Sequence, residues 1–190
     1  MEGSKRIIID PGHWHLFDHV ERNLAGIGVS LYLIDLVIIT HGHPDHLEGV
    51  RRFPRATHFA MNEYEYRLIR SLGGDYMNIP TPAFFLKEGD FVAGDIELKI
   101  IETPGHSPGS LCLYWPKEKA LVSGDVIFKD GIGRTDLPGG SGGLLKESIE
   151  KLARLDVKFL LPGHGEAILG QEAVRNNFET VKRYWFSVLQ

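Results

Sequence analysis

A short histidine-rich segment, placed directly after a strongly apolar stretch, constrains the fold more than any other feature. The segment Thr40-His41-Gly42-His43-Pro44-Asp45-His46 carries three imidazoles and one carboxylate. Residues 31–40 before it are densely Ile, Val and Leu, as in a strand that is buried on both faces. His41 and His43 are two residues apart, so on an extended backbone both can point toward one metal ion. Asp45 and His46 stand where the chain begins to turn into a helix, and we expect them to serve a second position close by.

Three further metal-binding side chains follow later apolar runs. His106 comes after residues 95–102, Asp125 after 120–122 and His164 after 157–161. Each lies beside glycine, where the backbone can come close to a bound group. Imidazole nitrogens and carboxylate oxygens together suit a borderline ion such as zinc, or iron or manganese. The pattern therefore predicts a metal centre on loops at the ends of strands, held by a rigid sheet scaffold.

The apolar patterning predicts strands and helices in an interleaved order. Residues 95–102 alternate as an antiparallel strand with one solvated face should, whereas residues 174–188 carry an apolar stripe at helical spacing. Expected strands are 5–10, 31–40, 57–61, 95–102, 110–115, 120–123 and 157–161, and expected helices are 16–24, 62–72, 144–155 and 174–188. We find no repeat or linker, so the sequence predicts one domain over residues 1–190, with sheets covered by helices on their outer faces.

Composition excludes several classes of partner. The 21 basic and 25 acidic residues leave a formal charge of −4, which disfavours binding to nucleic acid. Cys112 is the one cysteine, so it cannot form an internal disulfide. No signal-peptide core is present, and no apolar run approaches the roughly 20 residues of a membrane span. We therefore expect a cytoplasmic protein that acts on a small molecule without a membrane partner, and the sequence leaves its oligomeric state open.

The motifs in combination resemble the metallo-β-lactamase superfamily, and more narrowly its glyoxalase II-like (hydroxyacylglutathione hydrolase-like) branch. The resemblance extends from Ile8-Ile9-Asp10-Pro11-Gly12 to Pro162-Gly163-His164-Gly165. It implies an α+β fold, a four-layer αββα sandwich with the metals at one edge between two sheets. It also implies a set of seven ligands: His41, His43 and His106 for the first metal, Asp45, His46 and His164 for the second, and Asp125 bridging both.

Individual positions distinguish among members of that superfamily. Asp125 stands where many true β-lactamases place a cysteine ligand, so antibiotic hydrolysis is not expected. His43 stands where flavodiiron proteins carry glutamate, which disfavours oxygen reduction of that kind. Residues 125–140 are similar to those of glyoxalase II-like and persulfide dioxygenase-like members. The 26 residues after His164 have room for one helix but not for the glutathione-binding domain of glyoxalase II proper, so we expect a substrate other than lactoylglutathione.

The main functional prediction is a dinuclear hydrolase with two divalent ions, Zn²⁺ first and Fe or Mn as alternatives. A metal-bound hydroxide would attack a thioester or ester-type carbonyl of a small molecule. Asp45 and Asp125 are the expected catalytic residues, Asp45 as a proton acceptor and Asp125 as the bridge. Asp10 and Thr40 are candidates for orienting the histidines.

Two alternatives stay open from the sequence. One is a persulfide dioxygenase with a single iron held by His41, His106 and Asp125, because two histidines and one carboxylate form the facial triad of non-haem iron oxygenases. The other is a metal-stabilised binding module without turnover. Outside the seven ligands, His13, His15 and His19 are expected to have surface or core roles. Arg134 and Asp136 are expected either to contact substrate or to pair with each other. 

Overall fold

The computed structural model describes residues 4–73 and 78–189, which divide into two compact units. Unit 1 comprises residues 1–86 and 92–96, and unit 2 comprises residues 87–91 and 97–190. The expectation of one domain over residues 1–190 stays a prediction. Among the described residues, no helix is both long enough and apolar enough to cross a membrane.

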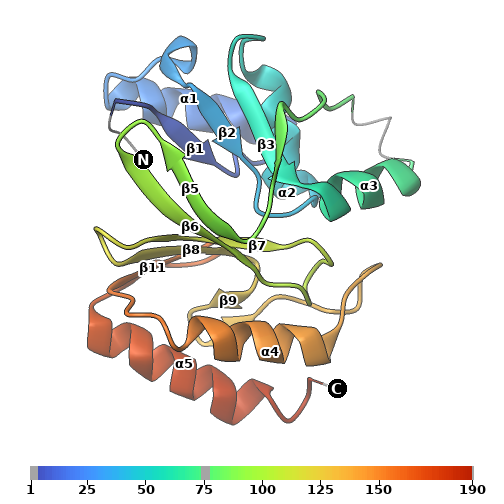
Figure 1. Cartoon of the computed structure of the whole chain (residues 1–190), viewed down its shortest axis with the longest axis vertical. Coiled ribbons are helices and arrows are strands. Elements are labelled where there is room, and N and C mark those ends of the chain that lie inside the picture. Colours follow the sequence, from blue (N-terminus) through green and yellow to red (C-terminus); the bar gives the residue numbers. More distant parts are fainter. Residues whose placement is uncertain (1–3, 74–77, 190) are drawn as a thin grey trace. The chain divides into compact units, whose positions relative to one another are not determined.

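Unit 1 is built on a sheet of four parallel strands in chain order (Figure 1). The strands are β1 (Ile7–Ile9), β2 (Leu36–Ile38), β3 (His58–Asn62) and β4 (Phe84–Leu86). The helices between them are η1 (Trp14–Leu16), α1 (Phe17–Gly26), η2 (Leu31–Leu33), α2 (Pro44–Leu47), η3 (Glu48–Arg52) and α3 (Glu63–Ser71). Parallel strands end at the same edge of a sheet, so the residues after β1 and those after β2 come together there.

Unit 2 is built on a mixed sheet of six strands in the order β12-β11-β8-β7-β6-β5. The strands are β5 (Gly89–Ala93), β6 (Ile96–Glu102), β7 (Leu111–Trp115), β8 (Ala120–Gly124), β11 (Phe159–Pro162) and β12 (Ile168–Leu169). Residues 92–96, where β5 turns into β6, count with unit 1. Strand β8 pairs with β11 in parallel and with β7 in antiparallel orientation. A two-stranded hairpin, β9 (Ile127–Phe128) with β10 (Gly131–Ile132), follows β8.

Each unit has its own apolar core. In unit 1, Val37, Ile39, Phe59 and Met61 are buried beneath Leu47 and other helix residues. In unit 2, helices α4 (Gly142–Leu152) and α5 (Gln171–Trp185) lie side by side along the sheet (Figure 1). Their apolar stripes pack on the strands, with Leu145, Ile149, Val174 and Phe178 among the buried residues. Because one face of each helix is buried, apolar residues recur at helical spacing in these parts of the sequence.

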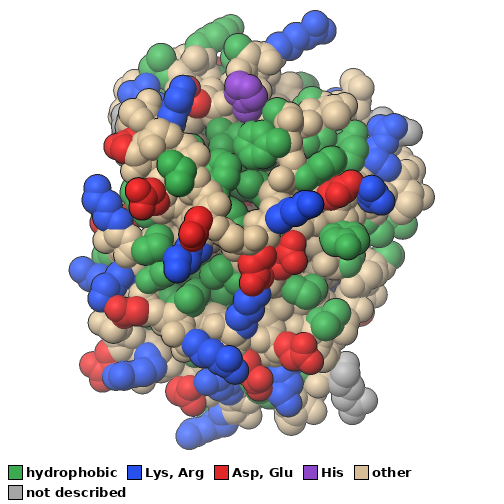
Figure 2. Space-filling model, in the orientation of Figure 1, with side chains coloured by type: hydrophobic (Ala, Val, Ile, Leu, Met, Phe, Trp, Pro, Cys, Tyr) green, Lys and Arg blue, Asp and Glu red, His purple; other side chains and the backbone are tan. Residues whose placement is uncertain are grey.

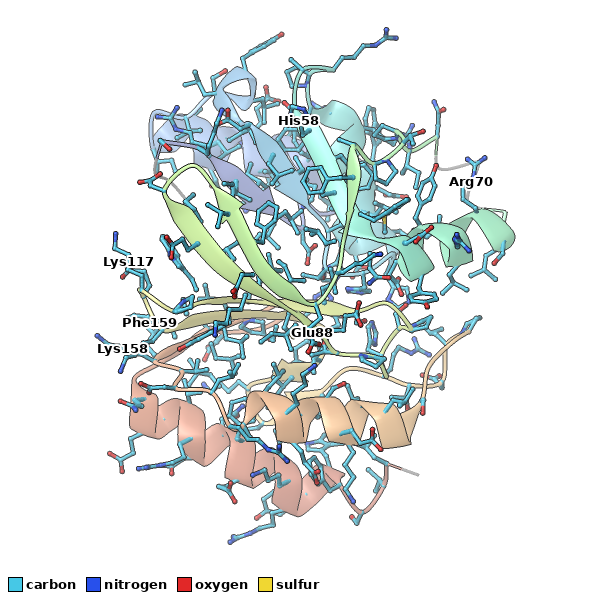
Figure 3. The ribbon with its side chains drawn as sticks, in the orientation of Figure 1. His58, Arg70, Glu88, Lys117, Lys158 and Phe159 are labelled. Carbon is cyan, nitrogen blue, oxygen red and sulfur yellow. The ribbon has the colours of Figure 1, made fainter. Side chains whose placement is uncertain are left out.

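The charged side chains of α4 and α5 lie at the surface of unit 2. Figure 2 shows Lys and Arg mixed with Asp and Glu over the region of α4 and α5 on the visible face. Lys151 of α4 donates to Glu88, which also accepts the backbone N–H of Glu102 at 3.1 Å. At the other end of unit 2, the Lys158 ammonium lies 4.9 Å from the ring centroid of Phe159 (Figure 3).

One departure from the sequence prediction lies in a long apolar segment. Residues 31–40 do not form one strand, because they form the short helix η2 before the three-residue strand β2. Ser30 accounts for this difference, since its Oγ accepts the backbone N–H of Tyr32 at 3.3 Å and starts a 3-10 turn. The sequence also indicates that Gly73 and Gly74 end the helix expected over residues 62–72, and Gly74 lies outside the described residues.

Candidate metal centre

Unit 1 brings together four of the predicted ligands where the chain passes from β2 into α2. His43 is extended and caps α2, and Pro44 occupies its first turn. The ring of His41 lies 4.7 Å from that of His43 and 4.1 Å from that of His46, measured between centroids. Nε2 of His46 is 3.8 Å from Oδ2 of Asp45. His41 and His46 are buried, whereas His43 and Asp45 are partly exposed.

A single carboxylate, that of Asp10, orients two of these rings. Asp10 Oδ2 accepts from the Thr40 hydroxyl at 2.6 Å and lies 2.8 Å from His46 Nδ1, while Oδ1 accepts the Thr40 backbone N–H at 2.8 Å. The Thr40 hydroxyl also lies 3.0 Å from His41 Nδ1. Because its one proton goes to Asp10, the hydroxyl accepts from His41, and Nδ1 of both rings carries the proton. The lone pair of each ring is then on Nε2.

Helix α3 holds the same segment from a different side. The buried Glu65 carboxylate accepts the backbone N–H of Gly42 at 2.7 Å. A Cβ on Gly42 would lie 2.6 Å from Cδ1 of Ile69, closer than real Cβ atoms come to any atom. Helix α3 therefore packs directly on Gly42, and a larger residue between His41 and His43 would require the Ile69 side chain to move. Sequence reasoning missed Glu65 as a supporting residue.

Unit 2 brings together the other three predicted ligands. Asp125 follows β8 and His164 follows β11, and these two strands are parallel neighbours whose register matches Pro162 with Gly124. Asp125 Oδ2 lies 3.3 Å from Nε2 of His164 and 3.6 Å from Nε2 of His106. Asp125 and His106 are buried, but the His164 side chain is 51% exposed. Two imidazole nitrogens thus converge on one carboxylate oxygen at a partly open edge.

The loop that carries His106 is fixed by neighbouring backbone. His106 Nδ1 donates to the carbonyl of Arg134 at 2.7 Å, which leaves the lone pair of this ring on Nε2 as well. Gly105 has a φ of +137°, and a Cβ there would lie 2.2 Å from the backbone nitrogen of Leu145 in α4. The hydroxyl of Ser148, also in α4, donates to the carbonyl of Pro104 at 2.8 Å. Helix α4 therefore sets the position of His106.

The donor groups of each unit fit divalent metal ions. In metal sites the second nitrogen of a histidine ligand is almost always bonded to a carboxylate, a carbonyl or a similar group. His41, His46 and His106 show this arrangement. In each ring Nδ1 is bonded to an oxygen atom of the protein, so the lone pair that can bind a metal is on Nε2. Imidazole and carboxylate donors suit zinc, iron or manganese.

The side chains of Arg134 and Asp136 bond to each other. The guanidinium donates to both carboxylate oxygens, at 2.7 Å and 2.6 Å. This hydrogen bonding from Arg134 lowers the pKa of Asp136 to about 2. Both side chains are largely exposed, so of the two roles expected from the sequence the structure shows the ion pair.

Comparison with known proteins identifies the family. The model of the metallo-β-lactamase superfamily matches residues 2–164. The probable metallo-hydrolase MJ0888 of Methanocaldococcus jannaschii is 35% identical over 178 residues, covering 86% of this chain and 84% of that protein. Hydroxyacylglutathione hydrolase GloC of Haemophilus influenzae is 32% identical over 188 residues, covering 90% of this chain and 85% of that protein.

A solved structure agrees with the sequence relatives. The crystal structure of TTHA1623 in a di-iron-bound form is 26% identical, with a TM-score of 0.71, covering 90% of this chain and 86% of that chain. The predicted α+β fold class and the resemblance to hydroxyacylglutathione hydrolases are thereby confirmed. With a family model that spans most of its length, this chain belongs to the metallo-β-lactamase superfamily.

Proposed function

We propose that the protein is a dinuclear metal-dependent hydrolase that cleaves a thioester or ester-type bond of a small molecule. The observation that carries the proposal is the orientation of the histidine rings, whose Nδ1 atoms are bonded to Thr40, Asp10 and the Arg134 carbonyl. Family membership supports a metallo-hydrolase in general. The preference for a thioester is supported by the likeness to hydroxyacylglutathione hydrolase GloC.

Seven residues are proposed to hold two divalent ions. His41, His43 and His106 would bind the first, Asp45, His46 and His164 the second, and Asp125 both. Zn²⁺ is the first candidate, and the di-iron-bound form of TTHA1623 makes iron the second. When bound, such ions lower the pKa of water to near neutrality and polarise a carbonyl oxygen.

The two carboxylates among the ligands have different surroundings and so different proposed roles. The Asp45 side chain is 34% exposed, and it is proposed to accept a proton during turnover. The Asp125 side chain is only 9% exposed and lies against the rings of His106 and His164. It is therefore proposed to hold negative charge beside these two rings. The half-exposed His164 marks the edge where substrate would enter.

Metal content and turnover measured on one preparation test the proposal. The protein is purified without added metal, its metals are counted per chain, and it is assayed with thioesters, lactones and a persulfide. Close to two equivalents of metal together with hydrolysis support the proposal. One equivalent of iron with persulfide-dependent oxygen uptake would replace it with sulfur oxidation. Full metal loading without turnover of any of these substrates would instead indicate a binding module.

Removing single ligands tests the assignment of residues. We expect His41→Ala and Asp125→Ala each to lower kcat/KM by more than about 100-fold, because even residues that only orient ligands contribute 10- to 100-fold. His58→Gln is the matched control, since His58 is exposed at the start of β3 (Figure 3). Full activity in either ligand variant would contradict the mechanism.

A further inference from the structure

A second group of metal-binding side chains lies within unit 1, apart from the seven ligands. We propose that His13, His15 and Glu48 form a separate binding site for a divalent cation. One ligand atom from each residue lies within 4.8 Å of the others. His13 Nδ1 is 3.1 Å from Glu48 Oε2, and the rings of His13 and His15 are 4.8 Å apart between centroids. This site does not depend on the proposed hydrolase function.

The backbone beneath these side chains is tightly fixed. The N–H of Gly49 donates to the carbonyl of Gly12 at 2.7 Å, which joins the segment before η1 to helix η3. A Cβ on Gly49 would lie 2.7 Å from the Pro11 carbonyl oxygen and 2.9 Å from the ring of Phe17, so the two segments are in direct contact. Glu48 and His13 are the neighbours of these glycines. Their close placement is therefore set by the backbone and not by flexible side chains alone.

The residue between the two histidines is also held in place. The backbone N–H of Trp14 donates to Glu48 Oε2 at 3.2 Å. The guanidinium carbon of Arg51 lies 4.5 Å from the centroid of the Trp14 ring, and that of Arg52 lies 5.3 Å away. Such stacking of guanidinium on indole fixes the ring. Trp14 therefore connects η1 to η3 through both its backbone and its side chain. His13 and His15 are its neighbours in the sequence.

The donor set selects the kind of ion. Two imidazoles and one carboxylate are the ligand set of many zinc sites with an open position, and they also bind Cu²⁺ and Ni²⁺. The His13 side chain is 33% exposed and that of Glu48 is 23% exposed, so solvent can reach the ion and complete its coordination. His15 is exposed and can turn toward the other two ligands. The proposed site is therefore an open surface site for borderline divalent ions.

Zinc titration of the metal-loaded protein tests the site. Protein whose metal centre is loaded with Zn²⁺ is dialysed and then titrated with Zn²⁺ by calorimetry. We expect wild type to bind one further equivalent and His13→Gln/His15→Gln to lose it. His15→Gln and Glu48→Gln, each altering one ligand, are expected to weaken this binding at least tenfold. His19→Gln is the matched control, because His19 is an exposed neighbour on α1 that contacts Asn23 at 3.0 Å and lies outside the group.

Spectroscopy of a copper adduct supplies a second readout. Adding one equivalent of Cu²⁺ to the zinc-loaded wild type is expected to give an electron paramagnetic resonance signal coupled to two nitrogens, absent from His13→Gln/His15→Gln. Equal zinc binding in wild type and this double variant, or loss of binding in His19→Gln, would overturn the site. All variants keep the seven ligands, so the one-equivalent difference is expected whether or not those residues support hydrolysis. His15→Gln changes an exposed residue, so it still tests the site if the double variant does not fold.

Discussion

At the scale of single residues, Asp10 is connected by hydrogen bonds to two histidine rings of the candidate metal centre. It bonds to His46 directly and to His41 through the Thr40 hydroxyl. Its φ of +51° lies in the left-handed region, which asparagine and aspartate tolerate better than most residues. Asp10→Asn therefore preserves the backbone while replacing one carboxylate oxygen with an amide NH₂. The substitution isolates the hydrogen-bond pattern around the two rings.

We expect Asp10→Asn to lower zinc affinity about 10- to 100-fold, the range for groups that orient metal ligands. The amide cannot accept from the Thr40 hydroxyl, the Thr40 N–H and His46 Nδ1 in the way that both carboxylate oxygens do. Competition with a chromophoric chelator measures the affinity. Asp18→Asn is the control, because Asp18 is exposed and bonds to Arg52. Equal affinities for Asp10→Asn and wild type would show that Asp10 does not orient the rings.

The sequence predicted Asp10 and Thr40 as orienting residues but not Glu65. Asp10 and Thr40 were predictable because each stands at the end of an expected strand, next to a motif with few other interpretations. Glu65 stands three residues after Asn62, whose side chain caps α3 by accepting the N–H of Tyr64 at 2.8 Å. Asn-x-x-Glu is an ordinary pattern for the start of a helix, so it gives no signal of the bond to Gly42. Support of this kind depends on how α3 packs, which local sequence does not encode.

At the scale of elements, the β9–β10 hairpin supports the ligands of unit 2. Its chain continues into Gly133 and Arg134, and the carbonyl of Arg134 accepts from His106. On the other strand, the ring of Phe128 lies edge-on to that of His164, 5.9 Å between centroids. A Cβ on Gly133 would lie 1.8 Å from the carbonyl oxygen of Asp125 and 3.0 Å from His106 Nδ1. The hairpin can hold these ligands only while residue 133 has no side chain.

We expect Gly133→Ala to lower the free energy of unfolding by about 1–3 kcal/mol, as overpacking of a tight site does. The displaced Asp125 backbone should also weaken metal binding. Urea unfolding of the metal-free protein measures the first effect, and chelator competition the second. Gly143→Ala in α4 is the matched control, because a Cβ there meets nothing within 4 Å and alanine favours a helix. If both variants unfold at the same urea concentration, the close approach at Gly133 is not a constraint.

Elements with a clear apolar period were predictable from the sequence, and the two-residue strands were not. The apolar stripe at residues 174–188 predicted the helix observed as α5 (Gln171–Trp185). The alternation at residues 95–102 predicted the strand observed as β6. Strands β9, β10 and β12 have two residues each, too few to show any period, and they exist because a neighbour pairs with them. Residues 31–40 are apolar almost throughout, so periodicity could not separate η2 from β2.

At the scale of the whole molecule, exposed ion pairs contribute to the response to acid. Hydrogen bonds from Lys5, Lys151, Arg134 and Lys129 lower the pKa of Asp35, Glu88, Asp136 and Glu166, respectively. A carboxyl whose pKa is lower in the folded state stabilises the fold above its unfolded pKa, and the contribution disappears as the pH falls through the folded pKa. All four groups therefore act in the same direction and in the same acid range.

We expect the stability of the metal-free protein to fall progressively from about pH 4.5 to about pH 2, where Asp136 takes up its proton. These four carboxyls should contribute little pH dependence above about pH 6. Thermal unfolding followed by circular dichroism across this range measures the effect. Because the pairs are exposed, 1 M NaCl should reduce the acid-dependent part. Stability that rises between pH 4.5 and 3 would contradict the assignment.

The sharing of Asp10 by two histidines has a consequence for how this centre can evolve. If His41 and His46 serve different metal ions, as proposed, a single inherited change at Asp10 alters both ions at once. A descendant protein that bound only one of the two ions would still need the Asp10 carboxylate, even after losing the ligands of the other ion. It would first have to supply His46 or His41 with a new acceptor. Natural selection on Asp10 therefore acts on both proposed metal positions together.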